Sequence, residues 1–169
     1  LIIHPDIGNK PALFSHSSSD IRLSLNSSEQ LFYSANNPLY QSGTPSTKTI
    51  AINEISMVAF TLGNTLGFSV NGTFHDSGVN KASSGNSTFN QIGARQTMSN
   101  PFDGKMGEIM IIDSVSSTDR QRIEGYLAHK WNLVDVLPDN HPYKISIPIV
   151  GSSPFSTDVA SGSGQSLDL

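Results

Sequence analysis

Two groups of side chains in loop-like stretches of this 169-residue chain carry chemistry suited to sugars. Planar amides and carboxylates hydrogen-bond hydroxyl groups, and exposed aromatic rings stack on the C–H faces of sugars. Ordinary loop chemistry is the competing interpretation of each group. The sequence thus offers six candidate ligand-binding residues, which are Asn36, Asn37, Tyr40, Asn71, His75 and Asp76.

Oxygen ligands suited to calcium also fall in the expected loops. These are Asp76, Asn80, Asn100 and Asp103. A lone Asp in a loop is usually a turn residue, and Asp103-Gly104 is equally well explained as a turn. The sequence therefore predicts no firm metal site and no cofactor, although a calcium ion remains an open alternative. The five histidines show no paired spacing typical of zinc ligands.

The spacing of carboxylates argues against hydrolytic chemistry. Glycoside hydrolysis needs two carboxylates about 5–10 Å apart. The nearest candidates, Glu108 and Asp113, are five residues apart in an expected strand, so alternation places them on opposite faces. No nucleophile elbow, His-Glu-x-x-His motif or phosphate-binding loop is present. We therefore expect the chain not to be an enzyme.

Apolar residues at alternate positions predict short β-strands along most of the chain. The Asn71-Gly72 dipeptide predicts a tight reversal between two of them, since both residues tolerate positive φ. The apolar run Met110-Ile111-Ile112 predicts a strand covered on both faces. No strand is expected before residue 12, and the expected strands are 12–14, 21–25, 30–33, 55–62, 66–71, 73–76, 88–93, 105–113 and 145–150.

One helix is expected, at residues 117–131. Ser116 precedes Asp119 by three residues, which resembles a capping box. The helical period predicts a core-facing side with Ile123, Tyr126, Leu127 and Trp131, and a solvent side with Arg120, Glu124 and Lys130. Trp131, the single tryptophan, is thus expected to pack in the core rather than to stack on a sugar. Gly125 weakens the helix by about 1 kcal/mol relative to Ala, so packing must hold it in place.

Composition narrows the class of protein. Charged residues make up only 14% of the chain, and Ser, Thr and Asn replace them, which suits strands and loops better than long helices. The net charge of -4 and the lack of a basic stripe argue against nucleic acid as a partner. No apolar run approaches the roughly 20 residues of a membrane-spanning helix, so membrane insertion is not expected. There is no cysteine to form a disulfide.

A stretch in the second half of the chain resembles a known family. The succession FNQIGARQ, NPFDGKMGEIMIID, a capped helix and GYLAHKW, within residues 88–144, is similar to the C-terminal half of laminin-G-like modules of the concanavalin A-like superfamily. The hairpin ISMVAFTLGNTLGFSVNGT resembles another unit of that family. The resemblance implies an all-β, two-sheet antiparallel jelly-roll sandwich with one short helix. It also implies a setting that is extracellular, on a cell surface or in a virion.

Two functions are compatible with these patterns. The first is a non-enzymatic recognition module for carbohydrate binding or adhesion in a secreted or surface protein. The alternative is a structural assembly domain of a virion, such as a phage capsid-decoration, tail or fibre protein. The expected partner is accordingly a glycan or a neighbouring protein subunit. We expect one domain at 1–150 and a Ser/Gly-rich tail or linker at 151–169; the start at Leu1 suggests a processed product, an excised domain or part of something longer.

Overall fold

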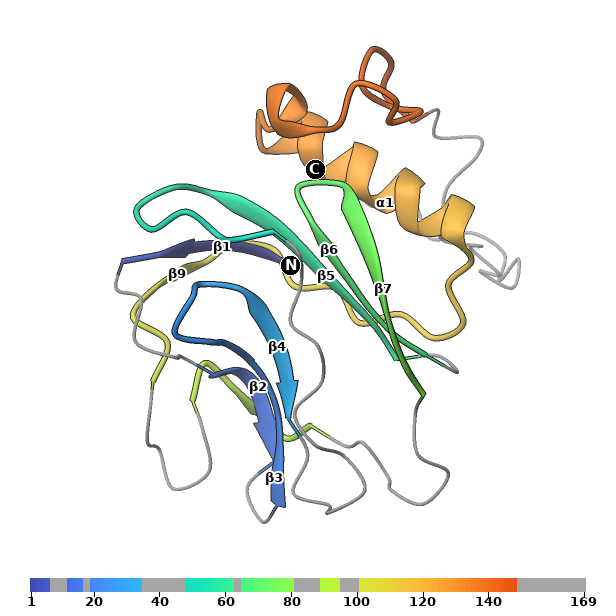
Figure 1. The fold of residues 1–169 in the computed structure, drawn as a ribbon. Helices are drawn as coiled ribbons and strands as arrows, with labels where there is room; N and C mark the ends of the chain where they lie inside the picture. The colour runs from blue at the N-terminus through green and yellow to red at the C-terminus, as the bar shows by residue number, and fades with distance from the viewer. Residues whose placement is uncertain are drawn as a thin grey trace, which may run out of the picture.

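The fold consists of two stacked antiparallel β-sheets and one α-helix (Figure 1). The computed structural model describes residues 1–6, 12–16, 19–34, 48–62, 65–80, 89–94 and 101–148, with the backbone alone at 16, 19–21, 34, 62 and 76–80. The two sheets and the single helix confirm the expected all-β sandwich.

The larger sheet has five strands in the order β7-β6-β5-β1-β9, and every neighbouring pair is antiparallel. A tight turn joins β6 to β7, with positive φ at Asn71 and Gly72, as the dipeptide predicts. In chain order the strands are β1 (Ile2–Pro5), β5 (Ser56–Leu62), β6 (Thr65–Val70), β7 (Thr73–Asn80) and β9 (Gly104–Met106).

The smaller sheet has four antiparallel strands in the order β4-β3-β2-β8. An irregularity in the β2–β3 pairing lies at Leu13, where two residues of β2 oppose one of β3. Such a bulge turns both Leu13 and Phe14 toward the interior, where both are buried. The strands are β2 (Ala12–His16), β3 (Ser19–Leu25), β4 (Leu31–Ser34) and β8 (Gln91–Ile92).

The main core lies between the two sheets. Period-two alternation sends every second side chain of each strand inward, and these side chains are apolar. From the larger sheet Ile3, Val58 and Phe68 contribute, and from the smaller sheet Leu23 and Leu25. Fully burying one such side chain contributes about 1.5–3 kcal/mol to stability. The apolar face of each sheet is therefore the one that meets the other sheet.

Helix α1 (Ser117–Lys130) packs on the outer face of the five-stranded sheet, so the molecule has three layers (Figure 1). Ile2 and Met57 face outward from that sheet and form a second apolar cluster with Leu127, Ala128 and residues that follow the helix. The helix therefore covers a face of the sandwich and does not close one of its ends.

The capping of the helix is as expected, but its solvent side is not. Ser116 Oγ accepts a hydrogen bond from the Asp119 backbone N–H at 3.1 Å. Glu124, expected in solvent, is buried, whereas Tyr126, expected in the core, is exposed. The helix is rotated on the sheet so that Glu124 faces the sheet, and polar partners on other elements make its burial tolerable. The expected packing of Trp131 against the core is confirmed.

Several expected strands differ in the structure. β1 was not expected, yet it is a central strand of the larger sheet. The expected strand at 105–113 is wrong beyond its first residues, because only Gly104–Met106 is a strand. The expected strand at 145–150 is also wrong in its described part, since 145–148 pair with no strand and Ile145 is 96% exposed. The expected tail at 151–169 lies outside the described residues and stays a prediction.

Gly125 stands where the C-terminal segment crosses the helix. A Cβ at this position would collide with the Cβ of Tyr143. Tyr143 is held there by two contacts, its backbone oxygen to His129 Nε2 at 3.0 Å and its hydroxyl to Arg122 Nε at 3.3 Å. Close packing against Tyr143 therefore requires glycine at position 125, although glycine has a low helix propensity.

The substitution Gly125→Ala is expected to lower the free energy of unfolding by about 1–3 kcal/mol, because the added methyl group overpacks the contact with Tyr143. Helix propensity alone predicts the opposite sign, a gain of about 1 kcal/mol. Urea unfolding measures the difference, with Gln121→Ala on the same helix as a control that should stay within about 0.5 kcal/mol. A more stable Gly125→Ala variant would show that Tyr143 does not pack against the helix.

Candidate functional site

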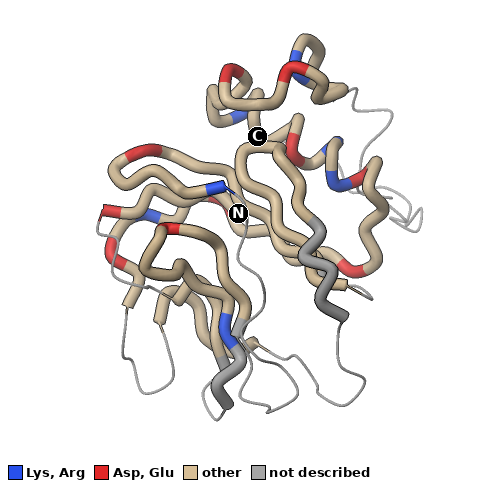
Figure 2. Tube along the Cα trace, in the orientation of Figure 1, with Lys and Arg blue, Asp and Glu red and all other residues tan. Residues whose placement is uncertain are grey.

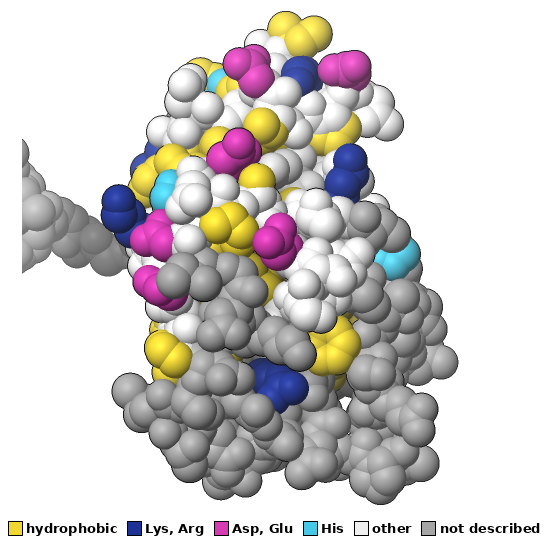
Figure 3. Space-filling model, turned by 60° about the vertical axis from the view of Figure 1, so that its left-hand side comes forward, with side chains coloured by type: hydrophobic (Ala, Val, Ile, Leu, Met, Phe, Trp, Pro, Cys, Tyr) yellow, Lys and Arg dark blue, Asp and Glu magenta, His cyan; other side chains and the backbone are white. Residues whose placement is uncertain are grey.

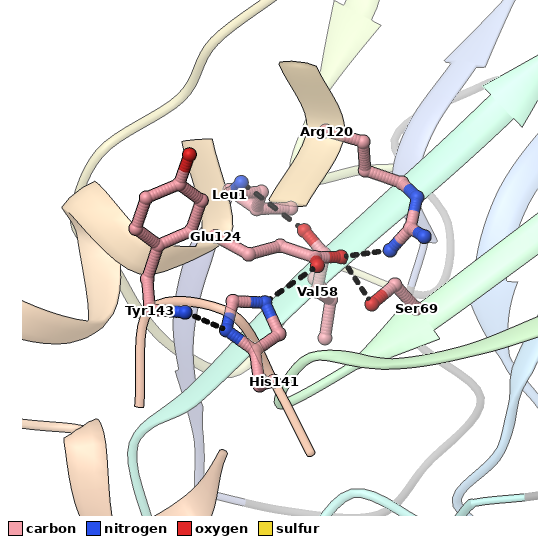
Figure 4. Close-up of polar contacts among 7 residues, drawn as sticks. All are labelled: Leu1, Val58, Ser69, Arg120, Glu124, His141 and Tyr143. Atoms are coloured by element: carbon pink, nitrogen blue, oxygen red, sulfur yellow. Dashed lines mark hydrogen bonds and ion pairs between the residues drawn. The ribbon is translucent and has the colours of Figure 1, made fainter. Parts of the chain in front are cut away.

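The best-defined polar cluster in the described residues surrounds Glu124, at the interface between α1 and the five-stranded sheet (Figure 4). Its side chain is only 2% exposed. Three groups from different elements reach it: Ser69 Oγ of β6 donates at 2.5 Å, Arg120 Nη1 of α1 at 2.7 Å, and His141 Nε2 lies 3.4 Å away. Both oxygens of the buried carboxylate are therefore occupied.

The electrostatics of this cluster favour an ionised Glu124. Burial raises the pKa of the carboxyl group, but the hydrogen bond with His141, the charge of Arg120 and the hydrogen bond from Ser69 outweigh it. The net pKa of Glu124 lies below its ordinary value of 4.5. The Tyr143 backbone N–H donates to His141 Nδ1 at 3.3 Å, which leaves Nε2 to donate to the carboxylate.

Arg120 also contacts the sheet itself. Its guanidinium carbon lies 4.2 Å from the centre of the Phe74 ring, a cation–π contact, and that ring in turn lies over Gly67. Arg120 is thus enclosed between an aromatic face and a carboxylate, with 11% of its side chain exposed. The cluster joins helix, sheet and C-terminal segment.

This arrangement does not activate a nucleophile. In a catalytic triad the histidine lies between the acid and the hydroxyl and takes its proton. Here Ser69 and His141 each bind Glu124, so the carboxylate stands in the middle and the hydroxyl does not contact the histidine. The cluster is accordingly structural.

A second glutamate, Glu108, lies beside the C-terminal end of the helix. Its Oε2 accepts from Trp131 Nε1 at 3.1 Å and lies 2.9 Å from Lys130 Nζ. Desolvation raises the pKa of Glu108, but Lys130 and Trp131 lower it further, so the net pKa lies below 4.5. Its expected companion, Asp113, is exposed and lies beyond the end of β9. The structure therefore does not place the two carboxylates on one strand.

The structure describes three of the six sugar-binding candidates, because Asn36, Asn37 and Tyr40 lie outside the described residues. Asn71 has a role in the sheet. Its side-chain oxygen accepts from the Met57 backbone N–H at 2.8 Å, and its own N–H donates to the Met57 carbonyl at 2.8 Å. The amide oxygen thus acts as an extra sheet acceptor at the β6–β7 turn.

His75 and Asp76 are neighbours in the middle of β7. His75 pairs with Phe68, whose side chain is in the core, and its Nε2 is buried with no hydrogen-bond partner. Asp76, of which the structure describes the backbone alone, pairs with Gly67. Asn71 and His75 thus each have a place within the sheet, and the predicted site that they form with Asp76 stays a prediction.

Two of the four calcium candidates lie in a strand and not in the loop where they were expected. Asp76 and Asn80 belong to β7, which is longer than the expected strand at 73–76. Asn100 lies outside the described residues, and Asp103 lies just before β9. Within the part of the chain that the structure describes, no three His, Asp or Glu side chains gather closely enough to hold a metal ion. Calcium binding thus stays a hypothesis.

The described surface has no extended region of one charge. Charged residues concentrate on α1 and in turns, and the strands carry few of them (Figure 2). On the side of the molecule seen in Figure 3, acidic and basic side chains are interspersed among apolar and polar ones. Among the described helices, none has the length and apolar character needed to cross a bilayer.

Comparison with known protein families identifies the fold. Residues 5–120, more than half of the chain, match a laminin G family model described as the Concanavalin A-like lectin/glucanases superfamily. The chain belongs to this superfamily. The match covers the strands from β2 to β9 and the first turn of α1. Searches of curated proteins and of solved structures gave no match. The superfamily contains both lectins and glucanases, so membership leaves binding and hydrolysis as alternatives.

Sequence reasoning missed the Glu124 cluster. Ser69 precedes Glu124 by 55 residues, and His141 follows it by 17, so no local spacing connects them. One signal was present in the sequence. Glu124 lies four residues before Ala128 and three before Leu127, and this spacing places all three side chains on one face of the helix. A glutamate on the apolar face of a helix indicates buried partners.

We expect Glu124→Gln to lower the free energy of unfolding at pH 7 by about 3 kcal/mol, because it leaves Arg120 enclosed without its counter-charge. The pKa of Glu124 is lowered in the fold, so the carboxylate contributes fully above pH 4.5 and its contribution declines as the pH falls below that value. The stability difference between wild type and variant should therefore shrink on acidification.

Denaturant unfolding from pH 7 down to pH 3 measures this difference. Glu54→Gln, at an exposed glutamate in the turn before β5, is the matched control and should change stability by less than about 0.5 kcal/mol. A difference for Glu124→Gln that stays constant with pH would mean that the charge of Glu124 does not stabilise the fold.

Proposed function

We propose that this chain is a non-enzymatic carbohydrate-recognition or adhesion module of a secreted or surface protein. The observation that carries the proposal is its match to the concanavalin A-like lectin and glucanase superfamily over residues 5–120. In this fold two rigid sheets hold the loops at the sandwich ends, and such scaffolded loops are where binding residues concentrate.

The electrostatics of the two best-placed glutamates favour binding over hydrolysis. A glycosidase general acid must keep its proton near neutral pH, which requires a raised pKa. The pKa values of Glu108 and Glu124 are both lowered by fixed donors. Neither side chain is therefore suited to donate a proton to a leaving sugar.

The strand ends favour one end of the sandwich as the binding region. The β6–β7 turn is covered, because a Cβ at Gly72 would lie 2.7 Å from Leu137 and 3.1 Å from Pro138. The strands β4 and β7 both run toward the other end (Figure 1). Asn36, Asn37 and Tyr40 follow β4 directly in sequence, so we place the ligand at that end and leave Asn71 out of it.

A glycan array, run with and without calcium, tests the proposal. We expect at least one class of oligosaccharide to bind, and Tyr40→Ala to weaken that binding by roughly tenfold or more through loss of ring stacking on the sugar. Tyr126→Ala removes an exposed tyrosine on α1 and is the matched control, with affinity unchanged.

The absence of binding to a broad array in both conditions would contradict the proposal. Release of reducing sugar from a β-glucan would contradict its non-enzymatic part. Binding that is lost equally in Tyr40→Ala and Tyr126→Ala would place the ligand elsewhere.

A virion assembly domain is the second candidate, and one observation favours it. Ile145 and Ile147, two residues apart, are 96% and 64% exposed, which suits a contact with a neighbouring protein subunit. Light scattering over a range of concentrations distinguishes the two. Self-association abolished by Ile145→Ser would favour assembly, and a monomer at all concentrations would oppose it.

A further inference from the structure

Two described turns carry the acceptor pattern for N-linked glycosylation, which is Asn-X-Ser/Thr with X other than proline. The tripeptides are Asn26-Ser27-Ser28 and Asn71-Gly72-Thr73. A third match, Asn86-Ser87-Thr88, lies outside the described residues. Such short matches also arise by chance in a chain rich in Ser and Thr. The surroundings of the two described turns decide which of them can carry a bulky sugar in the folded chain.

Asn26 lies in the turn between β3 and β4, and the exposed Ser27 and Ser28 follow it. Its side-chain oxygen accepts from the Ser28 backbone N–H at 2.8 Å and from the Gln30 backbone N–H at 3.0 Å. This arrangement is an Asx turn, and a positive φ at Glu29 completes the reversal of the chain. The oxygen therefore fixes the orientation of the Asn26 side chain.

The side-chain nitrogen of Asn26 has one hydrogen to spare. Nδ2 carries two hydrogens, and among the described residues it donates to one acceptor, Gln30 Oε1, at 3.1 Å. An N-linked sugar replaces one of the two hydrogens, so the other can still donate to Gln30. The two hydrogen bonds accepted by the side-chain oxygen are also kept. A sugar on Asn26 is therefore compatible with the hydrogen bonds of the turn.

The turn at Asn71 is covered by the chain itself. The Asn71 side-chain oxygen accepts from the Met57 N–H of β5. A Cβ at Gly72 would lie 3.3 Å from the His141 ring, so the C-terminal segment packs directly against this turn. His141 is in turn held by the buried Glu124. A sugar on Asn71 would have to displace this segment.

We propose that Asn26 accepts an N-linked oligosaccharide and that Asn71 does not. The proposal rests on the secreted or surface setting proposed above, because the donor class is an oligosaccharide linked to a lipid through pyrophosphate, which chains meet during export. Asn26 Nδ2 forms a bond with the anomeric carbon of the sugar and loses one proton. The bond between that carbon and the pyrophosphate breaks, and the lipid pyrophosphate leaves.

A sugar on Asn26 leaves the proposed ligand-binding end free. β4 begins at Leu31, soon after this turn, and runs toward the end of the sandwich at which we place the ligand (Figure 1). The β3–β4 turn therefore lies at the opposite end. A bulky, hydrophilic oligosaccharide there adds to the solubility of the module and does not enter the ligand-binding region.

Secretion of the chain from cultured animal cells, followed by peptide mapping with mass spectrometry, tests the proposal. We expect most secreted molecules to carry an oligosaccharide on Asn26 and none on Asn71. Ser28→Ala removes the hydroxyl group that the acceptor pattern requires but keeps the backbone N–H that Asn26 binds, so the sugar on Asn26 should be lost. Ser27→Ala is the matched control, because it changes the other exposed serine of the turn and keeps the pattern.

Circular dichroism verifies that each secreted chain is folded. The proposal is overturned if Asn26 is bare in the folded wild-type chain, if both serine variants lose the sugar alike, or if Asn71 is modified in folded chains. The cells supply the secretory setting, so a bare Asn26 would contradict the acceptor site and not the function proposed above. A glycan array probed with unmodified chain made in bacteria tests that function separately.

Discussion

The five-stranded sheet must be covered on both of its faces, and the rest of the structure follows from that constraint. Its inward side chains, such as Val58 and Phe68, join the core with the smaller sheet. Its outward side chains Ile2 and Met57 are also apolar and need a second cover. Helix α1 provides it. The molecule is thus a three-layer structure, and burial of apolar area on two faces is its main stabilising contribution.

The cover on the outer face is fixed by polar contacts as well as by apolar packing. Apolar contact is non-directional, whereas the buried carboxylate of Glu124 requires donors at defined positions. Ser69, Arg120 and His141 supply them from the sheet, the helix and the C-terminal segment. The cluster thereby sets the position of the helix on the sheet. This positioning role accounts for a cluster of polar side chains around Glu124 that is not arranged as a catalytic triad.

Local patterns in the sequence predicted the strands β2 to β4, the β5–β6–β7 meander and the capped helix, because each depends on contacts between near neighbours. They failed where the partner is distant. β1 is four residues long, and its strand character comes from pairing with β5 and β9, some 50 and 100 residues away. The run Ile109–Ile112 is apolar like a buried strand, but the backbone hydrogen bonds between this segment and β1 end at Glu108.

The candidate site shows the same limit. Asn71 was identified as a turn residue from its dipeptide, but only the structure shows that its amide oxygen accepts from the Met57 N–H. The position of His75 opposite Phe68 likewise becomes known only with the register of β6 and β7. The binding region at the far end of the sandwich, including Tyr40, remains a proposal based on family membership and on the direction of the strands.

Trp131 is the single tryptophan, and it packs in the cluster between the helix and the five-stranded sheet, so its fluorescence reports on the contact between these two layers. Far-ultraviolet circular dichroism of the same sample reports mainly on the two sheets. If the helix is an integral cover of the five-stranded sheet, urea unfolding followed by the two signals will give coincident transitions. A fluorescence transition at clearly lower urea than the dichroism transition would contradict this account, because the sheets would then persist without their outer layer.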